Sequence, residues 1–104
     1  MLNLKSLSVK TGIKQKVLTE IRDLAVRHGI NRVVLFGSRA RGDFRDRSDI
    51  DLAVSGGNAG RFRLAVEEEA STLLKFDVVE MEKSVSCELL AVIEKEGIVL
   101  YEKV

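Results

Sequence analysis

Two short apolar runs enclose a polar, arginine-rich turn within residues 33–54, and this stretch constrains the fold more than any other part of the chain. The first run ends at Gly37-Ser38, and the second carries Asp49 and Asp51. Side chains two residues apart in a strand project from the same face, so the two aspartates are expected side by side. Adjacent carboxylates repel each other unless an arginine or a hard divalent metal ion lies between them. Backbone N–H groups at a Gly-Ser bend can approach an anion closely, so metal and phosphate together suggest a nucleotide.

Length and composition narrow the class of protein. With 104 residues, 45% of them hydrophobic, we expect one compact domain spanning residues 1–104. The single cysteine, Cys87, cannot form an internal disulfide, which favours a reducing compartment. No apolar run approaches the length of a membrane span, and residues 1–30 lack the apolar stretch of a signal peptide. These features predict a cytoplasmic protein without a membrane partner.

Hydrophobic periodicity predicts the order helix, strand, strand, helix, strand, helix, strand. The helices are expected at about 12–28, 61–74 and 87–96, and the strands at 33–36, 48–54, 76–81 and 98–101. Residues 1–10 carry no strong signal and are expected to fray, with Thr11 capping the first helix and Ser84 or Ser86 the last. This order predicts an α/β (α+β) fold, a small mixed sheet with helices mainly on one face. The other face, which carries the aspartate pair, is expected to stay open for a ligand.

Several other kinds of catalytic site are excluded by the residues present. One histidine, His28, near a helix end, is incompatible with a histidine-rich zinc site and disfavours a Ser-His-Asp triad. Gly37 and Gly42 have the spacing of the two glycines of a P-loop, but Asp43 stands where its lysine belongs. No G-x-G-x-x-G run opens a helix, so a dinucleotide fingerprint is also missing.

Gly37-Ser38, ten intervening residues and Asp49-x-Asp51 resemble the signature of the nucleotidyltransferase superfamily that includes DNA polymerase beta. The runs Phe-Gly-Ser-Arg-Ala-Arg-Gly and Ser-Asp-Ile-Asp-Leu-Ala-Val look most like the minimal nucleotidyltransferases, the MNT-type antitoxins whose partners are HEPN-domain toxins. This resemblance implies a polymerase beta-like nucleotidyltransferase fold. It also implies transfer of AMP from ATP to a tyrosine of a HEPN toxin, which blocks the RNase activity of that toxin.

The resembled family uses a third carboxylate on a later strand, and Asp77 in the run Phe-Asp-Val-Val matches that position. Glu80 is its competitor. Strand parity places the two side chains on opposite faces, so only one of them can join the pair, and the resemblance selects Asp77. Asp49, Asp51 and Asp77 are then expected to hold Mg²⁺, as two ions, and to be the catalytic residues. Asp77 is expected nearer the acceptor hydroxyl, lowering its pKa.

The glycine, serine and arginine residues of the stretch are suited to binding an anion. The Gly-Ser bend is expected to bind the β- and γ-phosphates of ATP, and the two arginines that follow it are expected to donate charge-assisted hydrogen bonds to the triphosphate. The next two arginines, Arg45 and Arg47, are assigned to surface or partner contacts. The residues expected to bind the nucleotide are Gly37, Ser38, Arg39 and Arg41.

The acceptor is expected to lie on another chain, because the catalytic fold would occupy all 104 residues. A hetero-oligomer with a HEPN-domain toxin follows from the resemblance. The alternative is a catalytically silent nucleotide-binding module that neutralises or supports a partner by docking alone. Three retained carboxylates weigh against it, because an unused cluster costs repulsion. A nucleic-acid partner has little support, because the net charge is +1 and the aromatics are one tyrosine and four phenylalanines.

Overall fold

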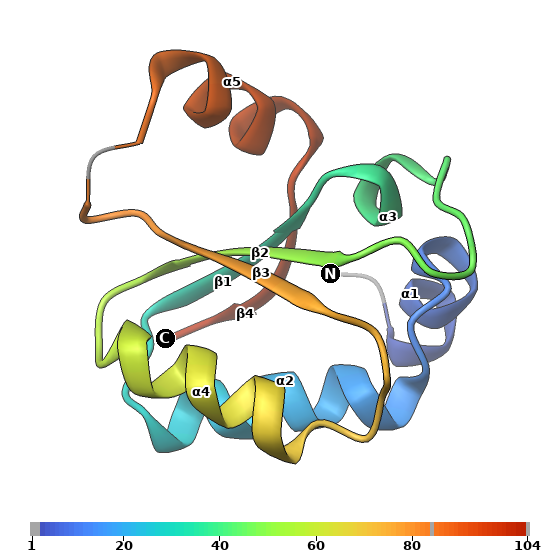
Figure 1. Ribbon diagram of the computed structural model, residues 1–104, viewed down its shortest axis with the longest axis horizontal. Helices are drawn as coiled ribbons and strands as arrows, with labels where there is room; N and C mark the ends of the chain where they lie inside the picture. The colour runs from blue at the N-terminus through green and yellow to red at the C-terminus, as the bar shows by residue number, and fades with distance from the viewer. Residues whose placement is uncertain (1–2, 84, 104) are drawn as a thin grey trace.

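The computed structural model describes residues 3–83 and 85–103 (Figure 1). Within these residues helices and strands alternate along most of the chain. They are α1 (Leu4–Thr11), α2 (Gln15–Arg27), β1 (Arg32–Phe36), α3 (Ser38–Arg41), β2 (Ile50–Ser55), α4 (Ala59–Glu69), β3 (Phe76–Glu80), α5 (Cys87–Glu96) and β4 (Ile98–Glu102). None of the helices in this described part is long and apolar enough to cross a membrane.

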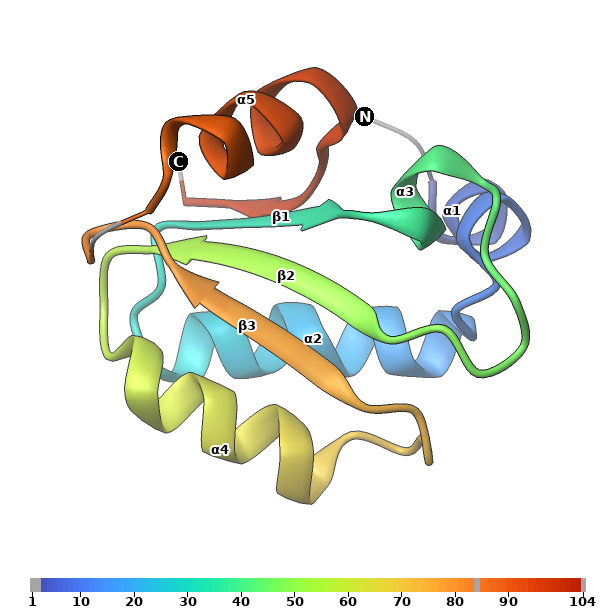
Figure 2. The same ribbon diagram turned by 45° about the horizontal axis from the view of Figure 1, so that its top comes forward.

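The strands form one mixed sheet in the order β3-β2-β1-β4. β1 is antiparallel to both β2 and β4, whereas β2 and β3 are parallel. The parallel pair exists because α4 carries the chain from the end of β2 back to the level where β2 began, as a crossover connection must (Figure 2). The predicted mixed sheet is confirmed.

Alternating side chains divide the sheet into two unequal faces. One face packs against α2 and α4, where Val33, Leu35 and Leu52 are fully buried together with Phe62 of α4 (Figure 2). The opposite face carries a smaller apolar cluster, onto which α5 packs through Ile93. The prediction of helices mainly on one face is therefore confirmed, and α5 covers part of the face that bears the aspartates.

The strongest periodic signals lie where they were predicted. The apolar stripe of α2 is buried, and Gly29, with a φ of 68°, follows the end of that helix. α5 has the predicted bounds, and the Ser86 side chain caps it by accepting from the Leu89 N–H at 3.1 Å. The other suggested cap, Ser84, lies outside the described residues.

Two expectations for the N-terminal part are wrong. Residues 4–11 form α1, whose first turn is capped by the Asn3 side chain and whose Leu7 is fully buried. Thr11 does not cap α2, because its hydroxyl donates to the Leu7 carbonyl at 2.6 Å and accepts from the Ile13 N–H at 3.2 Å. These bonds hold the end of α1 and the connection to α2.

The helix predicted to reach residue 74 is also shorter than expected. Asn58 caps α4 through the Arg61 N–H, so the helix starts two residues early, at Ala59. It ends at Glu69, because Glu20 of α2 accepts hydrogen bonds from both the N–H and the hydroxyl of Ser71 at 2.8 and 2.7 Å. Residues 70–75 are consequently irregular and lead directly into β3.

Candidate active site

The parallel pairing of β2 and β3 places two carboxylates next to each other. Asp51 is the register partner of Asp77, on the face opposite α2 and α4. Glu80 points to the other face, where it accepts a hydrogen bond from Arg63 of α4 at 2.6 Å. The predicted parity of β3 is confirmed, and Glu80 is not part of the cluster. Asp49 is exposed and lies one residue before β2 begins.

Electrostatics couple the three aspartates. The pKa of Asp51 rises from 3.8 to about 6, because the side chain is partly buried and because Asp77 and Asp49 repel its negative charge. The positive charge of Arg41 opposes this shift. Asp51 is therefore a carboxylate whose ionisation would be favoured by a nearby cation.

The donor set suits a hard divalent cation, since carboxylate oxygens are the ligands that Mg²⁺ prefers. Asp51 and Asp77 lie side by side, and the raised pKa of Asp51 reflects a repulsion that such an ion would relieve. As the side chains are placed, no three histidine, cysteine, aspartate or glutamate residues within 3–83 and 85–103 converge around one point. Asp49 and Asp77 are both exposed, whereas Asp51 is half-buried.

A sharp bend after β1 lies against the carboxylate of Asp51. β1 ends at Phe36, the register partner of Asp51, and Gly37 follows with a φ of 77° and a ψ of −159°. A Cβ atom on residue 37 would lie 2.2 Å from Oδ2 of Asp51, so any residue other than glycine would displace that carboxylate. Ser38, half-buried, opens the single helical turn α3, in which the N–H groups of Ala40 and Arg41 donate to the Gly37 carbonyl.

Arg39 does not occupy the position expected of a triphosphate ligand. Its side chain is only 2% exposed and lies over the ring of Phe44, with the guanidinium carbon 4.9 Å from the ring centroid. Its guanidinium donates at 3.0 to 3.4 Å to the main-chain carbonyls of Thr11, Arg45, Asp46 and Ser48. Burial lowers the pKa of Arg39, and the charge of Asp46 counteracts this. Arg39 thus holds the 45–48 loop against the end of α1, and this placement gives no support to the predicted nucleotide contact.

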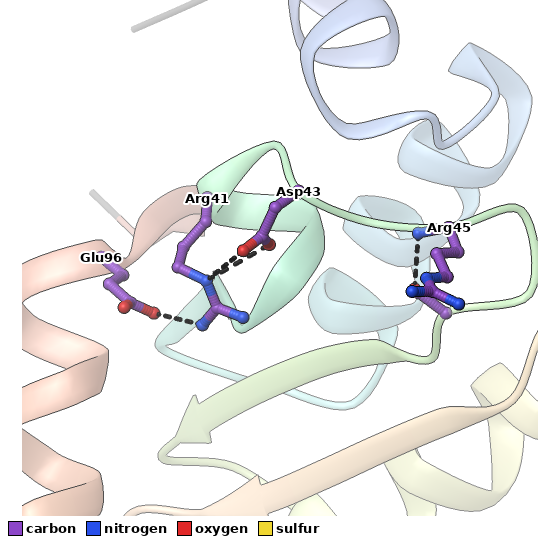
Figure 3. Close-up of polar contacts among 5 residues, drawn as sticks. Arg41, Asp43, Arg45 and Glu96 are labelled. Atoms are coloured by element: carbon purple, nitrogen blue, oxygen red, sulfur yellow. Dashed lines mark hydrogen bonds and ion pairs between the residues drawn. The ribbon is translucent and has the colours of Figure 1, made fainter.

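Arg41, in contrast, remains accessible near the carboxylates. Its Nε donates to both carboxylate oxygens of Asp43 at 3.3 and 3.2 Å, and its Nη1 donates to Oε2 of Glu96 at 3.0 Å (Figure 3). These contacts raise the pKa of Arg41. Figure 3 shows Arg45 farther along the loop, where its N–H donates to the Ser48 hydroxyl.

Glu96 is the neighbour of the site that sequence reasoning missed. It ends α5 and lies 55 residues from Arg41 along the chain, so no local spacing links them. Its side chain is 23% exposed, against 42% for Arg41. The contact ties the last turn of α5 to α3 beside the aspartates.

Comparisons with known proteins found one matching family model and several solved structures of similar fold. The family model described as "Polymerase beta, Nucleotidyltransferase" matches residues 19–104. A crystal structure of a toxin–antitoxin with AMP-PNP is 26% identical with a TM-score of 0.67, covering 83% of this chain and 73% of that one. A protein assigned as a minimal nucleotidyltransferase is 29% identical with a TM-score of 0.62, over 93% of this chain and 95% of that one. A MntA-HpeT toxin–antitoxin variant shares the fold at 24% identity and a TM-score of 0.64, over 83% and 73% of the two chains. No curated protein matches the chain.

Proposed function

Because the chain belongs to the polymerase beta nucleotidyltransferase family, we propose that it moves AMP from ATP to a hydroxyl of a partner protein and thereby acts as an antitoxin. Membership of this family identifies the chain as a nucleotidyltransferase. The observation that carries the rest is the contact of Gly37 with Asp51, which stands beside Asp77, because it joins a phosphate-binding bend to a carboxylate pair. The likeness to a toxin–antitoxin bound to AMP-PNP supports both the nucleotide and the partner.

The carboxylates have distinct tasks in this proposal. Asp49, Asp51 and Asp77 would hold Mg²⁺, which when bound neutralises the charge that develops on the triphosphate during transfer. The acceptor oxygen forms a bond to the α-phosphorus, the bond from that phosphorus to the bridging oxygen breaks, and pyrophosphate leaves. Asp77, on the edge strand of the sheet, takes the proton of the acceptor hydroxyl.

The phosphates are bound by the bend and by one arginine. The main chain at Gly37-Ser38 and the Ser38 hydroxyl contact the β- and γ-phosphates, since glycine leaves room for their approach. Arg41 provides charge-assisted hydrogen bonds to the triphosphate. Its exposed guanidinium can leave Asp43 or Glu96, because exposed ion pairs are weak.

For the partner, we propose a HEPN-domain toxin with a tyrosine as acceptor, assembled with this chain as a hetero-oligomer. The support is the sequence resemblance to MNT-type antitoxins, together with the toxin–antitoxin complexes among the similar structures. The alternative is a silent module that neutralises the partner by docking alone.

Intact-mass spectrometry tests the transfer. The purified chain is incubated with ATP, Mg²⁺ and the protein encoded by the adjacent gene, and the partner is expected to gain one or more AMP units. Asp51→Asn and Asp77→Asn should abolish the adduct, whereas Asp23→Asn, an exposed aspartate of α2, should not. An adduct that persists with Asp51→Asn refutes the site. Neutralisation of the partner without any adduct establishes the silent module instead.

A further inference from the structure

A large open groove begins at Asp49 and extends away from the carboxylate pair. Its volume is about 1070 Å³, and it lies between the α1–α2 connection, the loop before β2 and the irregular segment 70–75. Figure 2 shows these three segments at the end of the sheet where β2 and β3 start. The groove exists because α4 stops at Glu69 and leaves residues 70–75 outside regular structure.

The wall of the groove is partly apolar. Ile13 and Val17 are buried at its base, whereas Leu73 is fully exposed beside it. Leu74 is half-buried next to Leu73. A fully exposed leucine beside a groove is suited to contact with an apolar side chain from outside the chain.

The charged residues of the groove are mostly cations. Lys14, Arg47 and Lys75 line it, and within the described residues none of the three pairs with a carboxylate. The acids of the lining are Asp46 and Asp49, and Asp49 is already assigned to the metal. The groove therefore complements an occupant with acidic groups.

The size and lining of the groove favour a polypeptide over a nucleotide or a nucleic acid. Its volume lies at or above the upper end for small-molecule pockets, about 300–1,000 Å³. Among the described residues that line it none is aromatic, so no side chain offers a stacking surface to a base. An acidic peptide with one or more apolar side chains matches both the cations and the exposed leucine.

The groove is also continuous with the site. Asp49 belongs to both, and Lys75 precedes Asp77 by two residues. We propose that this groove docks an acidic, partly apolar segment of the partner chain and so brings the acceptor hydroxyl to Asp77. The inference rests on the proposed function and adds the surface that selects the acceptor.

Acidic substitutions at exposed positions test the groove without disturbing the core. The test variant is Leu73→Asp combined with Lys75→Glu, both exposed residues. Its matched control is Leu64→Asp with Lys103→Glu, an exposed leucine of α4 and an exposed lysine after β4. The measurements are the Kd for the protein encoded by the adjacent gene, the rate of AMP incorporation into it, the Kd for a fluorescent ATP analogue, and the urea midpoint.

The groove variant should bind the partner about tenfold or more weakly, which corresponds to about 1.4 kcal/mol, while the control binds like wild type. AMP incorporation should fall at sub-saturating partner, and the Kd for the ATP analogue and the urea midpoint should not change. Added salt should weaken wild-type binding more than binding by the groove variant.

Partner binding at wild-type strength by the groove variant overturns the inference. A parallel loss of ATP-analogue binding also overturns it and assigns the groove to the nucleotide. If the groove variant loses partner binding but wild type forms no AMP adduct, the docking surface stands and the proposed transfer fails.

Discussion

Replacing Gly37 with alanine probes the contact between the Gly37-Ser38 bend and the carboxylate of Asp51. The backbone at Gly37, with φ 77° and ψ −159°, lies in a region that is nearly exclusive to glycine, and a side chain there costs about 1–3 kcal/mol. The new Cβ would also lie 2.2 Å from Oδ2 and 3.1 Å from Cγ of Asp51, which forces that side chain off its rotamer for about 0.5–1.5 kcal/mol more. We expect Gly37→Ala to lower the free energy of unfolding by about 2–4 kcal/mol.

Urea denaturation of a matched set of variants separates the two contributions. Gly42 also has a positive φ, 94°, but a Cβ on it would meet no atom within 4 Å, so Gly42→Ala should cost only about 1–2 kcal/mol. In an Asp51→Ala background the Oδ2 and Cγ atoms are gone, and the cost of Gly37→Ala should fall by about 0.5–1.5 kcal/mol. Equal costs in the two backgrounds would refute the contact between Gly37 and Asp51. AMP transfer should be lost in Gly37→Ala and retained in Gly42→Ala.

Three further measurements test other parts of the site. The folded protein binds the Asp51 proton more tightly than the unfolded chain, because the pKa of Asp51 rises from 3.8 to about 6 on folding. As the pH increases from about 4 to 6, this residue therefore progressively lowers the free energy of unfolding. In Mg²⁺-free urea titrations at pH 8, Asp51→Asn should therefore be more stable than wild type by about 1–2 kcal/mol, after allowance for solvent screening. Below pH 4 the two proteins should be equally stable. The absence of a gain at pH 8 would contradict this reasoning. Arg39→Ala should lower the free energy of unfolding by about 3–5 kcal/mol, because a buried cation and its four carbonyl contacts are lost. Replacement of the exposed Arg47 with alanine should change this free energy by less than about 0.5 kcal/mol. A stable Arg39→Ala protein that fails to bind ATP would restore the original assignment. Glu96→Gln should tighten ATP binding about twofold to fivefold by releasing Arg41, and the same gain in an Arg41→Ala background would contradict that cause.

The face of the sheet on which each acidic side chain lies could be predicted, because it depends on local backbone geometry. Strand alternation separates Asp77 from Glu80 whatever the rest of the fold does, and the structure places them on opposite faces. The bounds of α5 were equally local, since Ser86 and Gly97 mark both ends. The direct pairing of Asp51 with Asp77 was not predictable, because it depends on the length and packing of α4.

The burial of Arg39 could not be predicted from the sequence. An arginine in a polar run has the same local pattern whether it is solvated or buried. Its burial depends on Thr11, 28 residues earlier, and on the folded 45–48 loop. α1 was missed for a related reason: its apolar residues are few, and its stability comes from burying Leu7 and Thr11. The capping residue Asn3 was the available signal.

The position of β3 at the rim of the sheet has a consequence for how such a protein can diversify. Asp51 lies on an inner strand, flanked on both sides, whereas Asp77 lies on the outermost strand with its far side unoccupied by another strand of the sheet. Under the proposed function, two neighbouring strands build the reaction centre, and the substrate that receives the nucleotide would arrive from beyond the second strand. If the groove docks the partner as proposed, changes in residues 70–75 would redirect the enzyme to a new recipient without altering the interior that holds the aspartates.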